Sequence, residues 1–305
     1  MLRFLLRRVI VALLVAATVL TLAFMLTRLS GDLAISIAGA NATQADVELI
    51  RKAYGLDRPL FIQFFDWVGR AMIGDFGESY FFKARTAALI GERMPVTITL
   101  GLTGLVIALV VSIPMGIAAA VNENTSIDRL VQFVALLGQA MPGFWLGLML
   151  MVTFGLQLGW LPISGTGSWQ HYVMPGIVLA FTAIPALTRL TRAGMIQAIG
   201  SDYIRTARAK GLSRASILLK HALRNAAIPV VAIAAVQLGF MLGGSIVIES
   251  VFALHGVGFL AWESIGKNDF PVVQAVVLVL AVIYVALTML ADVLNAVLDP
   301  RLRGA

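Results

Sequence analysis

The sequence predicts an all-α membrane protein with six transmembrane helices. Of its 305 residues, 59% are hydrophobic and 13% are charged, and the mean hydropathy is +0.91. An average soluble domain is about a quarter charged. Six apolar stretches can cross about 30 Å of hydrocarbon, a distance that takes about 20 helical residues. None of them alternates with the period of a barrel strand. Because lipid offers no partner to free backbone groups, we expect helices.

The six predicted spans lie at 9–28, 96–121, 131–155, 172–190, 226–249 and 272–294. The first resembles a secretory signal, but its apolar run is too long for one, so we expect a retained span. The chain is thus divided into 1–28 (N-terminus and first span), 29–95 (a loop with short helices), 96–298 (the core with five spans, which includes a loop at 194–225) and 299–305 (a tail).

Basic residues near the span ends predict the orientation of the chain. They precede the first span, follow the second, fill the loop after the fourth and close the chain, whereas the loop 156–171 has none and 250–271 has only Lys267. Both termini and the segment 201–226 are therefore predicted to be cytoplasmic. The loop 29–95 would be external, and loops of that length cross the membrane largely regardless of charge.

The external loop is predicted to fold. Thr43 is suited to cap a helix that runs through Tyr54 and stops at Gly55, and Pro59 suits the first turn of a second helix. That second helix, which ends at Gly74, has aromatic-rich apolar residues at helical spacing, so we expect it on the membrane interface or against the spans. The motif GDFGES follows at 74–79, and we favour a turn there over an external gate. Its candidate residues are Gly74, Asp75, Gly77 and Glu78.

No cluster of residues predicts catalysis or a metal site. The phosphate-loop pattern is missing, there is no cysteine, and His171, His221 and His255 lie far apart in the sequence. The span centres carry no ionisable residue, which disfavours a proton-coupled carrier. We interpret Glu249 as a helix-end residue at the outer face and Asp292 as the partner of a nearby arginine. The net charge of +7 indicates topology and affinity for anionic lipid rather than nucleic acid.

The segment SDYIRTARAKGLSRASILLKHALRNA, residues 201–226, is the most informative part of the chain. Gly200 breaks the fourth span, Ser201 or the next residue can cap a new helix, and Gly211 can end it. Ser213 can cap a second helix that reaches about Asn225. We expect two short helices lying across the span ends. Anionic lipid alone could hold such a basic segment, but the small residues among its arginines favour close approach of another protein.

This segment resembles the cytoplasmic signature loop of permease subunits of binding-protein-dependent ABC importers. That loop has E-A-A, three residues and Gly, then an apolar residue and L-P about ten residues further on. Aligned on Gly211, these positions are Arg205, Thr206 and Ala207, then His221, Leu223 and Arg224, so the Glu and the Pro are replaced. The form R-T-A-x-A-K-G-L with H-A-L-R-N-A is similar to the dipeptide, oligopeptide and nickel branch.

Other motifs extend the resemblance over nearly the whole chain. YGLDRPLFIQFFDWV, GDFGES, ERMPVTITLG, LPISGTG and DPRLR are similar to the first of the two permease subunits in that branch. The resemblance implies a type I ABC importer permease fold and a multi-pass transport subunit of a bacterial inner membrane. It implies no catalysis and no cofactor in this chain, because ATP and Mg would be held by a partner ATPase. The implied partners are a second permease subunit, one or two ATPases, an external solute-binding protein and membrane lipid.

The resemblance also implies roles for particular residues. The ATPase-coupling interface would consist of Arg205, Thr206, Ala207, Arg208, Ala209, Lys210, Gly211 and Leu212, supported by His221, Leu223, Arg224 and Asn225. Gly211→Val or Ala207→Asp is then expected to uncouple ATP hydrolysis from uptake. The expected cargo is a short peptide, with nickel, glutathione, an opine or an oligosaccharide as alternatives. A secondary carrier and a membrane enzyme or scaffold are the less favoured classes.

Overall fold

The computed structural model describes residues 2–29, 32–39 and 42–298, and these residues are largely helical. The long helices are α1 (Leu2–Leu29), α5 (Thr86–Val121), α8 (Val173–Ile199), α11 (Leu223–Val251) and α13 (Phe270–Leu298). The shorter helices are α2 (Leu33–Ala38), α3 (Gln44–Ala53), α4 (Leu60–Met72), α6 (Ser126–Ala140), α7 (Gly143–Leu150), α9 (Asp202–Ala209), α10 (Arg214–Ser216) and α12 (Val257–Gly266). Met151–Gln157 and Ile217–Ala222 are π-helical, and Trp169–Tyr172 forms a 3-10 turn.

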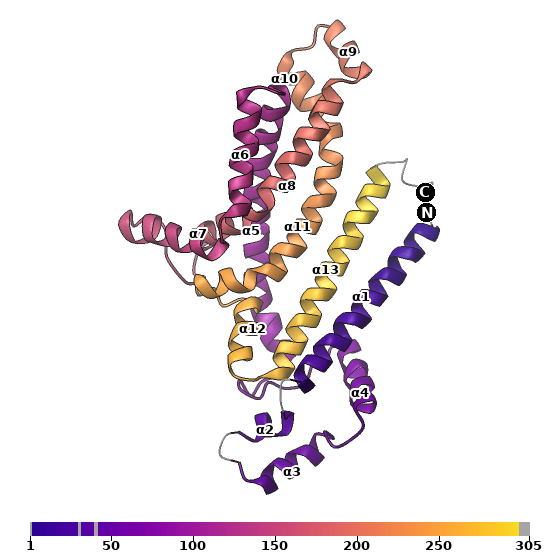
Figure 1. The fold of residues 1–305 in the computed structure, drawn as a ribbon, viewed down its shortest axis with the longest axis vertical. Helices are drawn as coiled ribbons and strands as arrows, with labels where there is room; N and C mark the ends of the chain where they lie inside the picture. Colours follow the sequence, from indigo (N-terminus) through magenta and orange to yellow (C-terminus); the bar gives the residue numbers. More distant parts are fainter. Residues whose placement is uncertain (1, 30–31, 40–41, 299–305) are drawn as a thin grey trace.

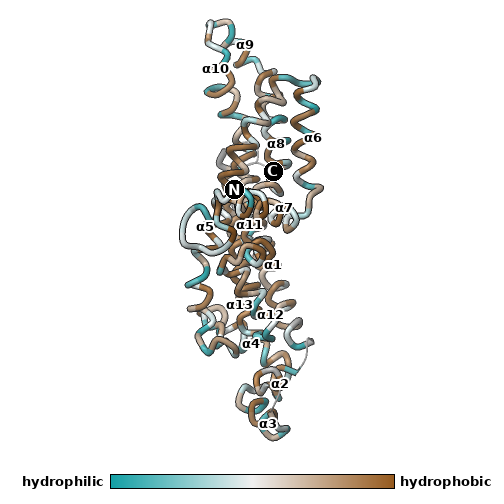
Figure 2. Tube along the Cα trace, turned by 90° about the vertical axis from the view of Figure 1, so that its left-hand side faces the viewer, coloured by the Kyte–Doolittle hydropathy of each residue, from teal (hydrophilic) through white to brown (hydrophobic). Residues whose placement is uncertain are grey.

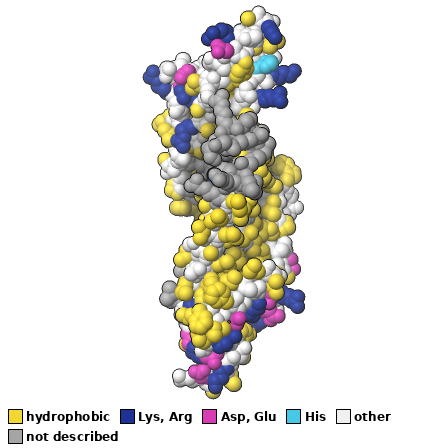
Figure 3. All heavy atoms as spheres, turned by 90° about the vertical axis from the view of Figure 1, so that its right-hand side faces the viewer, with side chains coloured by type: hydrophobic (Ala, Val, Ile, Leu, Met, Phe, Trp, Pro, Cys, Tyr) yellow, Lys and Arg dark blue, Asp and Glu magenta, His cyan; other side chains and the backbone are white. Residues whose placement is uncertain are grey.

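The molecule is elongated, with α9 and α10 at one end and α2, α3 and α4 at the other (Figure 1). We call these the α9 end and the α3 end. The middle of the chain trace is hydrophobic and both ends are more hydrophilic (Figure 2). Figure 3 shows a band of apolar side chains between two charged ends. Five helices of the described chain are long and apolar enough to cross a membrane, or up to six if one bent pair counts as a span.

That bent pair corrects the predicted straight span at 131–155. Helix α6 and the segment Gly143–Gln157 meet at an angle of 98°, and α7 extends sideways from the bundle (Figure 1). Met141, which ends α6, has an extended backbone with ψ 128°. The cause is Pro142, because a proline disfavours helical geometry in the residue before it.

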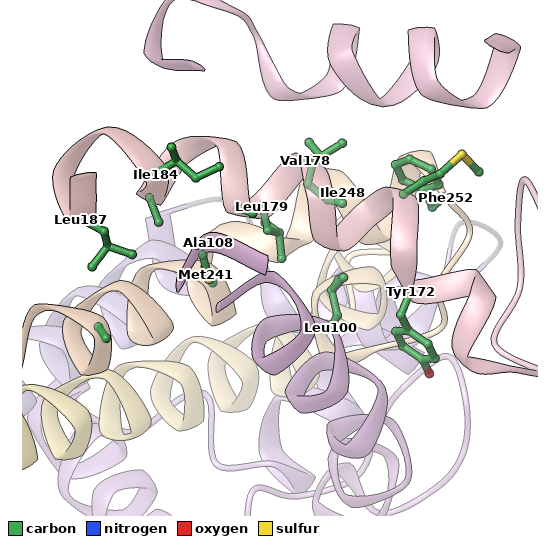
Figure 4. Packing of buried hydrophobic residues seen from close by; sticks show 14 of the residues in the cluster. Leu100, Ala108, Tyr172, Val178, Leu179, Ile184, Leu187, Met241, Ile248 and Phe252 are labelled. Atoms are coloured by element: carbon green, nitrogen blue, oxygen red, sulfur yellow. The ribbon is translucent and has the colours of Figure 1, made fainter. Parts of the chain in front are cut away.

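The core of the bundle lies where α5, α8 and α11 pack along one another. Figure 4 shows buried side chains from these three helices, among them Leu100, Leu179, Leu187 and Met241, directed toward one another. At Gly116 an added Cβ would lie 2.5 Å from the Thr191 Cβ and 2.9 Å from the Thr188 carbonyl oxygen. Because α5 and α8 approach so closely there, only glycine fits.

Helices α13 and α1 form the other side of the molecule. Helix α13 packs against α11, where a Cβ on Gly239 would lie 2.8 Å from the Tyr284 ring. Helix α1 runs beside α13 (Figure 1). The Arg8 guanidinium lies 2.9 Å from the Asp292 carboxylate and ties the two helices together. This ion pair confirms the predicted arginine partner of Asp292.

The helices at the α3 end follow the sequence signals. Thr43 forms a reciprocal capping box with Asp46 at the start of α3, and Gly55, with φ +62°, follows its end. Helix α4 packs on α1, where the Phe24 ring lies 5.4 Å from Phe64 and 6.1 Å from Trp67. The apolar face of α4 therefore contacts a span, which is one of the two predicted positions, the other being the membrane interface.

Candidate functional site

At the α9 end, the chain makes the short helix that the sequence predicts. Helix α8 stops at Ile199, and α9 is eight residues long. It ends because Gly211 adopts φ +76°, a left-handed conformation that suits glycine. The Gly211 N–H then donates to the Arg208 carbonyl at 2.9 Å, and the Leu212 N–H donates to the Ala207 carbonyl at 3.3 Å.

The second predicted short helix does not exist as a separate piece. The Ser213 hydroxyl accepts from the Ser216 N–H at 3.3 Å, as a cap should. The helix then continues without a break, so that Arg214–Val251 is one helical segment. Asn225 does not end it, because the residues around it favour helix, and Pro229 is accommodated inside α11. The loop thus consists of α9 and an extension of the fifth span.

Helix α9 is fixed firmly to this extension. Ile204 (0% exposed) and Ala207 (7%) are buried in an apolar cluster with residues of α5, α8, α11 and the π-helical segment Ile217–Ala222. The Asn225 side-chain amide donates to the Tyr203 hydroxyl at 2.8 Å. Ala207 is therefore small because it packs inside the chain, whereas Leu212 is 39% exposed. We conclude that α9 and the adjoining span ends form one packed unit.

The outer face of α9 presents cations and small residues. Its exposed residues are Asp202, Tyr203, Arg205, Thr206, Arg208 and Ala209, and the exposed Lys210 and Gly211 follow the helix. Among the supporting residues, His221 and Leu223 are half-buried, and Arg224 and Asn225 are exposed. Figure 3 shows lysine, arginine and histidine side chains at this end. A cavity of about 480 Å³, lined by residues that include Val121, Arg208 and Leu218, lies beside α9.

At the α3 end, the GDFGES segment has the backbone of a turn. Gly74 and Gly77 have φ values of +79° and +78°. The Asp75 carboxylate accepts from the Gly77 N–H at 3.1 Å. Glu78 and Arg85 form an isolated antiparallel β-bridge between their backbones. This geometry agrees with the turn that we favoured over an external gate. A gating role stays a prediction.

A buried carboxylate fastens this turn to the start of α13. Asp269 is 0% exposed, and it accepts hydrogen bonds from the Ser79 hydroxyl, from the Tyr80 N–H at 3.0 Å and from the Phe81 N–H at 3.3 Å. The Lys267 ammonium lies 4.5 Å from the centre of the Phe81 ring. Sequence analysis missed this contact, because its partners are about 190 residues apart.

Glu249 forms a second buried contact that sequence analysis missed. It lies near the end of α11, as expected, but it is 0% exposed and bonded on both carboxyl oxygens. The Thr97 and Ser245 hydroxyls donate to it at 2.8 and 2.9 Å, and the Phe259 N–H donates at 2.8 Å. The Thr97 hydroxyl in turn accepts from the Val257 N–H at 2.8 Å. Glu249 therefore joins α5 and α11 to the first turn of α12.

The fold and these contacts define a class of protein before any comparison. The described residues hold no group of three or more His, Asp or Glu that could bind a metal. The long apolar helices are able to cross a membrane, and a short helix is exposed at one end of the bundle. Such a chain has the architecture of a multi-pass membrane protein.

The chain belongs to the family described as binding-protein-dependent transport system inner membrane component, which matches residues 112–304. The N-terminal part of such components matches residues 1–101. The chain is 42% identical over 275 residues to the glutathione transport system permease protein GsiC of Escherichia coli strain K12, with 90% of each chain covered. The identity and coverage are the same for GsiC of Shigella dysenteriae serotype 1.

A solved structure supports the fold. The inward-facing MetNI methionine ABC transporter matches with a TM-score of 0.57 and 18% identity, over 69% of this chain and 96% of that chain. The fold is therefore the type I importer permease fold, with no strand in the described residues. The chain is a permease subunit of an ABC importer in the peptide and nickel branch. It is a transport subunit of the inner membrane that works with a solute-binding protein and an ATPase.

Proposed function

We propose that this chain is the subunit through which an ABC importer moves short peptides across the bacterial inner membrane, with α9 as its docking element for an ATPase. The observation that carries the proposal is the fixed position of α9. Because Ile204 and Ala207 anchor it to the ends of α8 and α11, a force on its exposed face reaches the spans. Such a link can convert movement of the ATPases into alternating access. ATP and Mg would be held by the ATPase.

The proposal also specifies how the chain is oriented in the membrane. The α9 end and both termini are cytoplasmic, a second permease subunit completes the pathway, and the solute-binding protein docks at the α3 end. The chain has no cysteine, so single cysteines can report its orientation. In spheroplasts, Ala45→Cys on α3 should react with a membrane-impermeant maleimide, and Ala209→Cys should react only after lysis. The reverse pattern would contradict the proposed orientation.

Peptide as cargo is supported by the similarity to GsiC over 90% of both chains. Glutathione, the cargo in that relative's name, is itself a tripeptide and is the second candidate. The test is uptake by the complete importer in proteoliposomes, with a labelled dipeptide competed by unlabelled oligopeptide, glutathione or a nickel chelate. Competition by peptides alone supports the proposal. Competition by glutathione alone favours the second candidate, and competition by the nickel chelate alone contradicts both.

The coupling role of α9 needs substitutions on its exposed face. Ala207→Asp would place a carboxylate inside the buried cluster and would report on folding rather than docking. Ala209→Trp adds bulk to the exposed face, and Gly211→Val strains the backbone at φ +76°. Both should leave ATP hydrolysis running while uptake falls at least tenfold. Ala88→Trp, exposed at the start of α5, is the control, and normal uptake by Ala209→Trp would contradict the proposal.

A further inference from the structure

A cavity with both polar and apolar lining lies at the α3 end, and none of the roles described above accounts for it. Its volume is about 290 Å³, and it lies between the end of α1, α2, the loop before α4, α4 itself, the GDFGES turn and the start of α13. Pockets that hold small molecules typically have about 300 to 1,000 Å³, so this one suits a ligand of amino-acid or dipeptide size. Its lining includes Arg28, Gln63, Arg70, Asp75 and Glu78.

Two lining residues carry buried polar atoms without a hydrogen-bond partner in the described part of the chain. They are the Arg28 Nε, a donor, and the Gln63 Oε1, an acceptor. Gln63 is 7% exposed, and its amide nitrogen already donates to the Leu56 carbonyl at 3.1 Å and to the Arg58 carbonyl at 2.7 Å. The amide is thus held in place by its nitrogen. A buried donor or acceptor left unpaired costs about 1–3 kcal/mol, which favours a ligand that satisfies both.

The charges around the cavity have both signs. Arg28 is held over the Phe24 ring at 5.0 Å, and among the described residues neither it nor Arg70 forms an ion pair. Asp75 and Glu78 supply carboxylates on the turn. Figure 3 shows basic and acidic side chains mixed at this end. A ligand with a single charge would therefore be attracted by one pair of residues and repelled by the other.

Aromatic groups complete the lining. Tyr54, Trp67 and Tyr80 contribute walls, and the Tyr54 and Tyr80 rings pack edge to face at 6.3 Å. Burial raises the pKa of Tyr80 to about 12, so its hydroxyl stays protonated and can donate a hydrogen bond. The cavity thus offers cations, carboxylates, an amide acceptor and hydroxyl donors within one small volume.

We infer that this cavity binds a small zwitterion, an amino acid or dipeptide, with the ligand carboxylate at Arg28 and Arg70 and its ammonium group at Gln63 Oε1 and Glu78. Arginine recognises carboxylates through directed, charge-assisted hydrogen bonds. The inference goes beyond the proposed function, because this site would bind a small zwitterion whichever cargo the complete importer carries.

The test is equilibrium binding to the full chain in lipid nanodiscs, measured by calorimetry. Glycylglycine is the zwitterionic probe, N-acetylglycine carries only the carboxylate, and glycinamide carries only the ammonium group. Glycylglycine should bind at least tenfold more tightly than either. Arg28→Gln should weaken glycylglycine binding at least tenfold. Glu78→Gln should weaken it severalfold without weakening N-acetylglycine binding.

Lys83→Gln is the matched control, because it removes one charge from the same region but does not line the cavity. It should bind glycylglycine as the unaltered chain does. If Arg28→Gln fails to fold, the exposed Glu78→Gln variant carries the test alone. Equal binding of glycylglycine and N-acetylglycine would overturn the inference, as would undetectable glycylglycine binding at millimolar concentration. Uptake plays no part in this assay, so failure of the proposed cargo would not affect its outcome.

Discussion

Replacement of Glu249 by leucine should destabilise the protein strongly, because the buried carboxylate accepts hydrogen bonds from three donors. The Ser245 hydroxyl also reaches the Leu242 carbonyl at 2.9 Å, so it keeps a partner. The Phe259 N–H and the Thr97 hydroxyl lose theirs. At about 1–3 kcal/mol for each buried unpaired group, the expected loss is about 2–6 kcal/mol. Glu249→Gln should cost about 0–2 kcal/mol, because its carbonyl can still accept from the Phe259 N–H.

The measurement is reversible unfolding of the purified chain in mixed micelles with increasing SDS, followed by tryptophan fluorescence. Trp262 on α12 is 56% exposed and reports on the helix that Glu249 holds. Thr97→Val should cost about 1–3 kcal/mol, since it leaves the Val257 N–H unpaired. Thr99→Val, exposed two residues away, should have almost no effect. If Glu249→Leu stays within about 1 kcal/mol of the unaltered chain, this reasoning is refuted.

Three further outcomes follow from other contacts. Asp269→Ala should speed amide hydrogen exchange in residues 79–82 at least tenfold, because two backbone N–H groups lose their acceptor; an unchanged rate, or equal acceleration by exposed Asp57→Ala, would contradict this. Gly116→Ala should lower thermal stability, because its Cβ would clash with α8, whereas Gly91→Ala, with open space around it, should not; equal effects would be evidence against close helix contact. The hydrogen bond from Arg51 on α3 lowers the pKa of Asp32 below its ordinary 3.8. The stability that this contact contributes is therefore present at neutral pH and is lost as the pH falls below 3.8. Limited proteolysis near α2 should increase only below that pH.

Much of this fold could be predicted because its signals are local. Long apolar runs produce the spans, Thr43 caps α3, and Gly211 ends α9 through a left-handed backbone. The ion pair of Asp292 was also within reach, because the charge pattern placed both chain ends at one side of the membrane. In each case the residues that decide the structure lie within one or two turns of the feature, or at the same membrane surface.

The errors have equally definite causes. The break at Pro142 was hidden by the hydropathy of 131–155, although the proline itself was the signal for it. The helix beyond Ser213 was ended too early, because a change from polar to apolar residues was mistaken for a boundary. Glu249 and Asp269 could not be assigned partners, since Thr97 and Ser79 lie 152 and 190 residues away.

The most direct test of the central claim, that α9 docks an ATPase, is crosslinking from its exposed face. Ala209→Cys, in a chain without other cysteines, would carry a maleimide-benzophenone and be irradiated in membranes that contain the complete importer. The account predicts a crosslinked product that mass spectrometry identifies as the ATPase. Ala88→Cys, at the start of α5 near the α3 end, should give no crosslink to the ATPase. Crosslinks from Ala209→Cys to lipid alone would contradict it, and α9 would then be a basic segment held at the membrane surface.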